Sequence, residues 1–294
     1  MVKKAIILCG GMATRMLPIC KSIPKEMLPL LDKPIIQYLV EELSEVGVTD
    51  ILIIVGRNKE AIVNHFDRNV EMEQLLVDRN KVQFLQDIKR PESLAKITYM
   101  RQINPRGTGH AIMLAKDWLG EDPFFMFFGD EVFDNPGNSR AKQLLTCFEK
   151  YKKTTIAVQR VKDMKEVVKY GNIKPKELEK GVFEVEKIVE KPRPEDAFSN
   201  ITTVGPAILT HDIFECIEKT PENNFEVGVT DSYQFLTDGR LVACELIGDR
   251  MDLGNKLGFI KSNISKALRD ENMKDEILKY ITELVEESKS KNKK

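Results

Sequence analysis

A loop rich in glycine and positive charge follows a short apolar run near the start of the chain. It contains Gly10 and Gly11 and continues to Arg15, and Lys25 lies further along the same segment. Glycine lets a backbone approach a ligand closely, and loop N–H groups together with positive side chains bind the oxygens of a triphosphate. These residue types in this position predict a phosphate site. For the two glycines taken alone, a tight turn is the structural alternative.

Two familiar phosphate motifs fit this loop poorly. No Gly-Lys-Ser or Gly-Lys-Thr follows the glycines, as a Walker loop requires, and the glycine spacing is not that of a dinucleotide fingerprint. Both of these interpretations are therefore weakened.

A carboxylate follows an apolar segment in the middle of the chain. Residues 124–128 (FFMFF) lead into Gly129, Asp130 and Glu131. A strand of this type would deliver Asp130 to the edge of a sheet where ligands bind. Mg²⁺ prefers oxygen ligands and takes only one or two protein carboxylates. Asp130 is therefore the first candidate for a metal ligand.

The elements that must position these residues alternate between strand and helix. Apolar runs typical of buried strands occupy residues 4–9 and 50–55, and helical patterns occupy 34–46 and 59–66. This order predicts an α/β fold, with a Rossmann-like mixed, mainly parallel sheet flanked by helices and ligands beyond the carboxyl ends of its strands. Turn-rich segments after residue 153 predict a partly antiparallel second half. Further strands are expected at 82–85, 97–102, 123–128, 155–160, 182–190 and 241–247, and further helices at 108–118 and 140–152.

The carboxyl-terminal region has a helical pattern of its own. Over residues 262–288 apolar side chains recur every three to four residues, which predicts one long helix or two. We expect one large domain over residues 1–262 and a helical segment over 263–294. The segment either packs only on its own domain or also helps to assemble an oligomer.

Composition excludes several classes of protein. The 294 residues are 42% hydrophobic and 31% charged, which suffices for a substantial core, and the net charge of -1 argues against a general nucleic-acid binder. The five cysteines are odd in number and unclustered, which favours reduced thiols over disulfides or a zinc site. No apolar stretch approaches the roughly 18–20 residues of a membrane helix. We therefore expect a cytoplasmic protein that binds neither nucleic acid nor membranes.

The segment over residues 14–43, TRMLPICKSIPKEMLPLLDKPIIQYLVEEL, resembles the amino-terminal signature of a known family. This family is the bacterial UTP–glucose-1-phosphate uridylyltransferases, within the larger group of sugar-nucleotide pyrophosphorylases. The resemblance extends to about residue 262 and implies a sugar nucleotidyltransferase fold for that domain and a homodimer or homotetramer. It also implies which residues of the first loop, and of the segment that follows it, bind the nucleotide: Gly10, Gly11, Thr14 and Glu26.

Two further segments resemble the family's base-reading elements. Gln102 follows Arg101, and residues 107–111 (GTGHA) are similar to the family's GLGHA. An amide offers both a donor and an acceptor to the imide face of uracil, and Gly107 lets a flat ring approach the backbone. The resemblance thus implies that Gln102 and Gly107 bind the base. His110, at the start of a helix, is interpreted as structural, because the expected chemistry needs no general base.

The sugar side is implied by two short motifs. Residues 190–192 match the family's EKP motif, in which Glu190 would accept hydrogen bonds from sugar hydroxyls and Lys191 would bind phosphate. Gly171 belongs to a segment similar to the family's YG turn beside the sugar, and Glu131 is a further sugar-binding candidate. Without this context, an exposed Glu-Lys pair on a strand is more often a solvated surface.

The resemblance also implies the reaction. Residues 249–258 are similar to the family's YDxGDKLG element, whose first aspartate, here Asp252, would complete a Mg²⁺ site with Asp130. A phosphate oxygen of glucose 1-phosphate would attack the α-phosphorus of UTP, releasing pyrophosphate and forming UDP-glucose. Because this nucleophile is already ionised, catalysis would consist mainly of alignment and charge neutralisation. The groups expected to supply the positive charge are Arg15, Lys25 and Lys191.

Several positions depart from the family's pattern. Ala13 stands where the loop usually has glycine, and a positive φ there would strain an alanine by roughly 1 kcal/mol. Two alternative functions stay open: a catalytically weak paralogue that regulates a family partner, and a pyrophosphorylase for another sugar 1-phosphate or nucleotide. The retained charged groups argue against the first. The other departures are Glu131, Pro206, Ala207 and Asn255.

Overall fold

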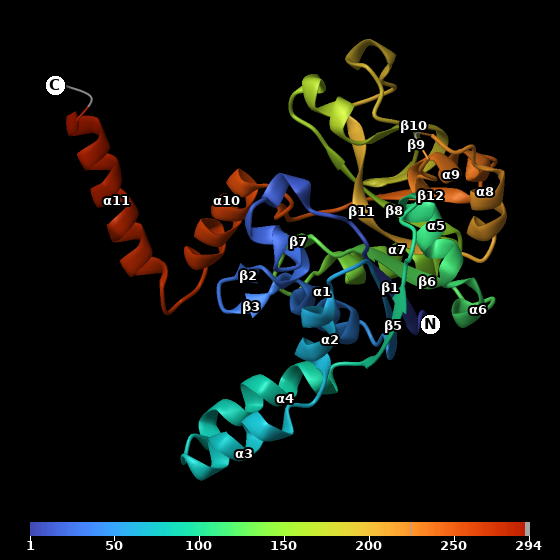
Figure 1. Cartoon of the computed structure of the whole chain (residues 1–294). Coiled ribbons are helices and arrows are strands. Elements are labelled where there is room, and N and C mark those ends of the chain that lie inside the picture. Colours follow the sequence, from blue (N-terminus) through green and yellow to red (C-terminus); the bar gives the residue numbers. More distant parts are fainter. Residues whose placement is uncertain (224, 292–294) are drawn as a thin grey trace.

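A mixed β-sheet forms the centre of the computed structural model, which describes residues 1–223 and 225–291. Within these residues the sheet has nine strands in the order β5-β4-β1-β6-β11-β8-β12-β10-β9 (Figure 1). The first four in this order are parallel to one another, as the alternation of strands and helices predicts. They are β5 (Lys96–Arg101), β4 (Asp50–Val55), β1 (Lys4–Cys9) and β6 (Phe124–Phe128).

Helices cover both faces of the parallel half, which explains why its strands are apolar without interruption. Along β1, Ile7 and Cys9 pack into one core cluster with α1, whereas Ile6 and Leu8 pack into a second cluster with α5. The helices of the predicted α/β alternation are α1 (Ile35–Glu45), α2 (Glu60–Phe66), α5 (Gly107–Leu114), α6 (Lys116–Leu119) and α7 (Arg140–Tyr151).

The second half of the sheet is largely antiparallel, as the turn-rich sequence after residue 153 predicts. β11 runs antiparallel to both β6 and β8, and β10 runs antiparallel to β12 and β9, while β12 and β8 are parallel. The strands are β8 (Thr154–Arg160), β9 (Gly171–Glu179), β10 (Val182–Glu190), β11 (Ile201–Leu209) and β12 (Leu241–Glu245), with helices α8 (Ile213–Lys219) and α9 (Val229–Ser232).

Two short antiparallel pairs lie beside the main sheet. β7 (Glu131–Asp134) pairs with β13 (Asp249–Asp252), and this pairing sets Asp252 opposite Glu131. β2 (Pro29–Leu30) pairs with β3 (Lys33–Pro34). Short 3₁₀ segments lie at Thr14–Met16, Ile19–Lys21, Lys25–Met27, Val82–Phe84, Met164–Lys169, Pro194–Asp196 and Tyr233–Leu236.

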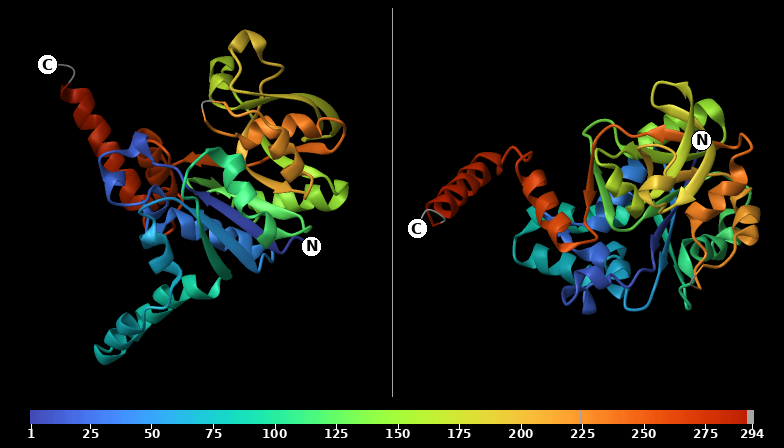
Figure 2. Two further views of the ribbon diagram at one scale, coloured as in Figure 1. Left: turned by 45° about the vertical axis from the view of Figure 1, so that its right-hand side comes forward. Right: turned by 90° about the horizontal axis from the view of Figure 1, so that it is seen from above.

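A helical hairpin replaces the strand expected at residues 82–85. α3 (Val70–Asp78) and α4 (Leu85–Ser93) project from the body as two adjacent helices (Figures 1 and 2), and Val82–Phe84 is the 3₁₀ turn that leads into α4. The strand prediction was therefore wrong. A run of four residues with three apolar side chains has the same pattern in a strand and in a helical turn, so its periodicity could not decide.

The carboxyl-terminal region forms two helices, α10 (Lys256–Ala267) and α11 (Lys274–Lys291). α10 runs across residue 262 and is fixed to the body, because Asn263 Oδ1 accepts a hydrogen bond from Leu31 N at 2.9 Å. α11 extends away from the body (Figure 1). The division into residues 1–262 and 263–294 stays a prediction, and its last three residues lie outside the described part. Among the described helices, none combines the length and the apolar character needed to span a bilayer.

Candidate active site

A cavity of about 740 Å³ opens at the carboxyl ends of the parallel strands, between the two halves of the sheet. Loops after β1, β5 and β6 supply one side, and the end of β10 with the segment before α9 supplies the other. This is the edge at which the sequence predicts ligands. The predicted site residues that line it are Gly10, Gly11, Lys25, Gln102, Gly107, Asp130, Glu190 and Lys191.

The glycine loop lies between the two predicted nucleotide-contacting side chains. A Cβ on Gly10 would stand 2.6 Å from Gln102 Oε1, and one on Gly11 would stand 3.4 Å from Lys25 Nζ. A side chain at Gly10 would therefore displace Gln102. Ala13 has φ +53° and ψ +39°, the left-handed conformation for which alanine is strained. The strain expected at this departure from the family's pattern is present.

Lys25 and Asp130 form an ion pair on the wall of the cavity. Lys25 Nζ lies 2.7 Å from Asp130 Oδ2, and both side chains are more than four-fifths shielded from solvent. Burial alone would lower the pKa of Lys25, but the adjacent Asp130 carboxylate outweighs burial and raises the pKa above its ordinary value. Lys25 is therefore a cation throughout the physiological pH range.

Asp130 and Asp252 come from distant parts of the sequence and border one glycine. A Cβ on Gly254 would lie 3.1 Å from Asp130 Oδ2 and 3.2 Å from Asp252 Oδ1. Asp252 is oriented by hydrogen bonds from the Gly254 amide and the Asn255 side-chain amide, each 2.9 Å long. The β7–β13 pairing, which sequence spacing cannot reveal, brings the two carboxylates together.

This donor set fits a hard divalent cation. Two carboxylates are the usual protein share for Mg²⁺, whose other ligands are water and substrate phosphates. Among residues 1–223 and 225–291, no group of three or more Asp, Glu, His or Cys side chains could hold a metal without such help. A metal at Asp130 and Asp252 would therefore complete its coordination with water and substrate phosphates.

Arg15 and Thr14 lie outside the cavity lining. Both belong to the 3₁₀ segment after Ala13, and both are exposed. The Arg15 guanidinium nevertheless approaches the carboxylate pair, because a Cβ on Gly254 would be 3.1 Å from its terminal nitrogen. Arg15 is thus close to Asp130 and Asp252, at the mouth of the site.

Glu26, which the sequence predicts to bind the nucleotide, lies in the core behind the cavity wall. Its side chain is fully buried and pairs with Lys59 Nζ at 2.6 Å. Burial raises the pKa of Glu26, which the Lys59 ammonium only partly opposes. In the short 3₁₀ segment Lys25–Met27, Lys25 faces the cavity and Glu26 faces the core. The Glu26 side chain thus forms a buried ion pair with Lys59 and does not line the cavity, and its role in nucleotide binding stays a prediction.

Glu131, a sugar-binding candidate from the sequence, has protein partners in the structure. It forms an ion pair with Arg250 and accepts a hydrogen bond from Gly205 N at 3.2 Å. It does not line the cavity, because β7 turns its side chain toward β11 and β13. Its interactions join three strands.

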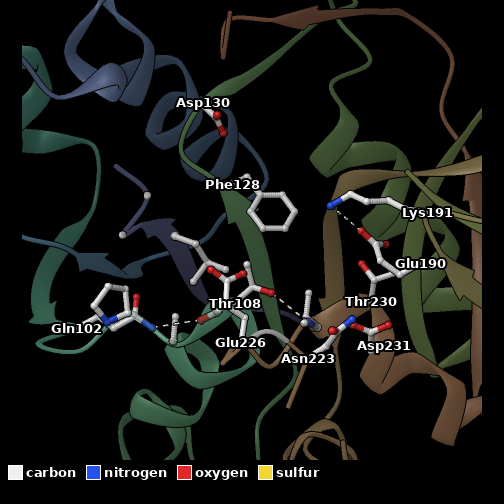
Figure 3. Close-up of a pocket in the computed structure, with 18 of the residues that line it drawn as sticks. Gln102, Thr108, Phe128, Asp130, Glu190, Lys191, Asn223, Glu226, Thr230 and Asp231 are labelled. Atoms are coloured by element: carbon white, nitrogen blue, oxygen red, sulfur yellow. Dashed lines mark hydrogen bonds and ion pairs between the residues drawn. The ribbon is translucent and has the colours of Figure 1, made fainter. Parts of the chain in front are cut away.

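The base end of the cavity is built around Gln102 and Gly107. Gln102 continues directly from β5, and its amide Nε2 donates to Gly107 O at 3.2 Å (Figure 3). Gly107 has φ +85°, and a Cβ there would lie 2.5 Å from Val227 O. Only glycine allows this close approach of the two loops.

The opposite end carries Glu190 and Lys191 at the end of β10. Lys191 Nζ lies 3.3 Å from Glu190 Oε1 (Figure 3), and Lys191 has a left-handed φ of +46°. Burial raises the pKa of Glu190, partly offset by Lys191. Gly171 pairs with Glu190 across β9 and β10, and a Cβ there would be 2.7 Å from Thr203 Oγ1 and 3.2 Å from Glu190 Oε2. Gly171 is therefore a close-packing position behind Glu190.

Sequence reasoning missed several side chains that complete the lining. Burial raises the pKa of Asp231, partly offset by Lys191, and Figure 3 shows Asp231 next to Asn223 and Thr230. A sequence signal for this part of the site is the segment over residues 226–231 (EVGVTD), which carries two carboxylates and a threonine at the start of α9. The added lining residues include Thr108, Phe128, Asn223, Glu226, Thr230 and Asp231.

Comparisons with known proteins agree with this geometry. The family model described as "Nucleotidyl transferase" matches residues 4–269. The chain is 41% identical to UTP–glucose-1-phosphate uridylyltransferase 2 of Staphylococcus saprophyticus and 42% identical to UTP–glucose-1-phosphate uridylyltransferase of Staphylococcus haemolyticus. Each alignment covers 96% of this chain and 98% of the relative.

Solved structures show the same likeness. A UDP-glucose pyrophosphorylase in complex with UDP-glucose matches with a TM-score of 0.83 at 36% identity, over 92% of this chain and 100% of that chain. A UTP-bound enzyme of the same kind from Acinetobacter baumannii matches with a TM-score of 0.89 at 32% identity, over 97% and 100% of the two chains.

Proposed function

Since this chain belongs to the nucleotidyl transferase family, we infer that it is a UTP–glucose-1-phosphate uridylyltransferase. It converts UTP and glucose 1-phosphate into UDP-glucose and pyrophosphate. Support comes from curated relatives of this activity that align over almost the whole chain, and from structural neighbours that bind UTP and UDP-glucose. The alternative of a catalytically weak regulatory paralogue is supported by the strained Ala13 alone, and the retained Lys25, Asp130 and Lys191 in the cavity argue against it.

One observation carries the proposal: a single cavity connects the predicted base end to the predicted sugar end. Figure 3 shows Gln102 at one end and Glu190 and Lys191 at the other, and Gly107 lines the cavity beside Gln102. Asp130 lines the same cavity and pairs with Lys25. A nucleotide and a sugar phosphate bound at the two ends would bring their phosphates together.

Alignment and charge neutralisation supply the catalysis. One phosphate oxygen of glucose 1-phosphate forms a bond to the α-phosphorus of UTP, and the bond from that phosphorus to the pyrophosphate breaks. Lys25 and the N–H groups of the glycine loop bind the triphosphate, and Lys191 binds the sugar phosphate and holds it for attack. Glu190 accepts hydrogen bonds from sugar hydroxyls, which positions the glucose. Arg15, at the mouth of the site, adds positive charge near the leaving pyrophosphate.

We propose Mg²⁺ as the divalent cation, held by Asp130 and Asp252. When bound, it neutralises phosphate oxygens and thereby makes the α-phosphorus easier to attack. The support is the oxygen-only donor set and the proximity of both carboxylates to Gly254.

Location and assembly are also proposals. All five cysteines are free thiols, which fits the reducing cytoplasm. A homodimer or homotetramer is supported by the exposed apolar side chains of the projecting α11, among them Leu278, Leu284 and Val285.

The test is a substrate panel. Purified protein with Mg²⁺ is given UTP, dTTP, CTP or ATP, each with glucose 1-phosphate or galactose 1-phosphate, and pyrophosphate release is followed. The proposal expects the highest kcat/KM for UTP with glucose 1-phosphate. A higher value for another pair reassigns the substrate, and no release from any pair contradicts the activity.

A further inference from the structure

Gln102 is held in place by a histidine that the reaction itself does not use. Its Nε2 lies 3.2 Å from Gly107 O and 2.8 Å from His110 Nδ1. The carbonyl oxygen of Gly107 can only accept a hydrogen bond, so the group that faces it must be the NH₂ of the amide. The same NH₂ faces His110, so Nδ1 must be an acceptor and the imidazole proton must reside on Nε2. The contacts thus determine both the orientation of the amide and the tautomer of the ring.

The other end of the Gln102 amide lies against the glycine loop in the cavity wall. Both amide hydrogens are used, and Oε1 lies against Gly10 in the wall of the cavity, where a Cβ on that glycine would be 2.6 Å away. Within the described part of the chain, no hydrogen bond to Oε1 is formed. Gln102 therefore contributes to the cavity wall a carbonyl oxygen, Oε1, that can accept a hydrogen bond.

We propose that His110 is a positioning residue for base selection: by accepting a hydrogen bond from Gln102 it holds Oε1 toward the base and so favours uracil over cytosine. The proposal rests on the proposed function, which places the base of UTP at this end. Uracil has an N3–H that can donate to Oε1, whereas N3 of cytosine is a bare acceptor that Oε1 would repel.

His110 matters because an amide can rotate. Without a fixed neighbour, Gln102 could turn its NH₂ toward the acceptor of cytosine and lose its selectivity. In the native site this rotation would set Oε1 against two acceptors, Gly107 O and His110 Nδ1. Removing one of these acceptors lowers the free energy of the wrong orientation by about the value of one hydrogen bond. This corresponds to roughly a tenfold change in relative affinity.

The surroundings of His110 favour the neutral ring that this arrangement requires. The side chain is half-buried on α5, and this burial lowers its pKa below the ordinary value. The positive charge of Arg106 lowers the pKa further, whereas the negative charge of Glu222 raises it. Arg106 and Glu222 are themselves paired at 3.4 Å. A protonated ring would place an N–H against the Gln102 NH₂. Acidification should therefore weaken uracil binding.

The test measures the equilibrium affinity of the full-length protein for UTP and CTP by calorimetry, with turnover followed in parallel. His110→Phe keeps a planar ring and removes the acceptor. His110→Asn keeps an acceptor oxygen near the position of Nδ1 and does not titrate. We expect the UTP-to-CTP affinity ratio to fall about tenfold in His110→Phe and to return in His110→Asn. We also expect acidification to lower UTP affinity more steeply in the wild type than in His110→Asn, because only the wild-type ring can gain a proton beside the Gln102 NH₂.

Two results would overturn the inference. One is a folded His110→Phe protein with the wild-type affinity ratio, and the other is a His110→Asn protein with the wild-type pH dependence. Should His110→Phe fail to fold, the pH comparison between the wild type and His110→Asn decides. Failure of the proposed function looks different: the wild type then binds UTP in preference to CTP and forms no UDP-glucose. A wild type that binds both nucleotides equally contradicts the role of His110 even when it makes product.

Discussion

Lys25 Nζ and Asp130 Oδ2 lie 2.7 Å apart on the wall of the cavity, so the cation assigned to the triphosphate and the carboxylate assigned to the metal neutralise each other. A triphosphate offers Lys25 another anion, and a divalent cation offers Asp130 another partner. When the triphosphate and the cation bind, the Lys25–Asp130 pair is replaced by two pairs, Lys25 with the triphosphate and Asp130 with the cation. The site therefore holds both charges in position before the ligands bind, at little electrostatic cost.

Replacing Lys25 should impair the reaction more than it impairs folding. Lys25→Ala removes a buried cation from the triphosphate site, and we expect kcat/KM to fall about 10²- to 10³-fold. Pyrophosphate release at saturating Mg²⁺ measures the loss. Lys21→Ala is the matched control, because Lys21 is an exposed lysine of the same segment that does not line the cavity. Wild-type turnover in a folded Lys25→Ala protein would remove Lys25 from the mechanism.

The left-handed alanine in the glycine loop predicts a stabilising substitution. Ala13 has φ +53°, so Ala13→Gly should raise the free energy of unfolding by up to about 1 kcal/mol, less the extra flexibility of glycine in the unfolded chain. Urea denaturation measures the change. Ala61, exposed within α2, is the control with the opposite sign, because Ala61→Gly should cost about 1 kcal/mol. Equal destabilisation by both changes would contradict the strain at Ala13.

Gly107 should tolerate no side chain, because its φ is +85° and a Cβ would lie 2.5 Å from Val227 O. Gly107→Ala should separate the base end of the cavity from the loop before α9 and raise the KM for UTP about tenfold or more. Gly120 has a similar φ of +65° with open space around its Cα, so Gly120→Ala tests backbone strain alone. The prediction fails if steady-state kinetics show the same KM for both variants.

How much of this site the sequence could predict depends on whether local pattern or tertiary pairing decides each part. The order of strands and helices predicts which loops meet at the carboxyl edge, and Gly10, Lys25 and Asp130 are found there. The adjacent residues Lys25 and Glu26 show the limit. Both residues belong to the same sequence motif. Only the direction of the 3₁₀ turn Lys25–Met27 places the Lys25 side chain toward the cavity and the Glu26 side chain toward the core.

Contacts between residues far apart in the sequence could not be predicted from the sequence pattern either. Asp130 and Asp252 become neighbours through the four-residue strands β7 and β13, which are too short to carry a distinct alternation. The resemblance to a family supplied this pairing, and the residues alone did not. His110 was interpreted as structural, yet the contact with Gln102 that gives it a specific task is visible only once α5 is folded against the end of β5.

Acid should loosen the attachment of α10. Asp134 is buried and binds Lys266 at 2.9 Å together with Arg269. Burial alone would raise the pKa of Asp134, but the hydrogen bonds from these two cations lower it below its ordinary value near 3.8. Because the folded pKa is the lower one, the stabilisation is complete above pH 3.8 and is lost as the pH falls through the folded pKa.

Asp134→Asn tests this linkage. At neutral pH it should lower the free energy of unfolding by about 1–2 kcal/mol and reduce the dependence of stability on pH below 4. Asp196→Asn is the control, because Asp196 is half exposed and its pair with Arg193 lies on the surface. Identical pH profiles for the wild type and Asp134→Asn would show that Asp134 does not contribute to the acid sensitivity.

The most direct test of the central claim follows the phosphorus atom itself. UTP labelled with ³²P at the α-position is incubated with glucose 1-phosphate, Mg²⁺ and either the wild type or Asp130→Ala, and the products are separated. The account predicts that the label moves into UDP-glucose with the wild type and that the rate falls at least about 10²-fold with Asp130→Ala. A folded wild-type protein that binds UTP and transfers no label to the sugar would contradict it.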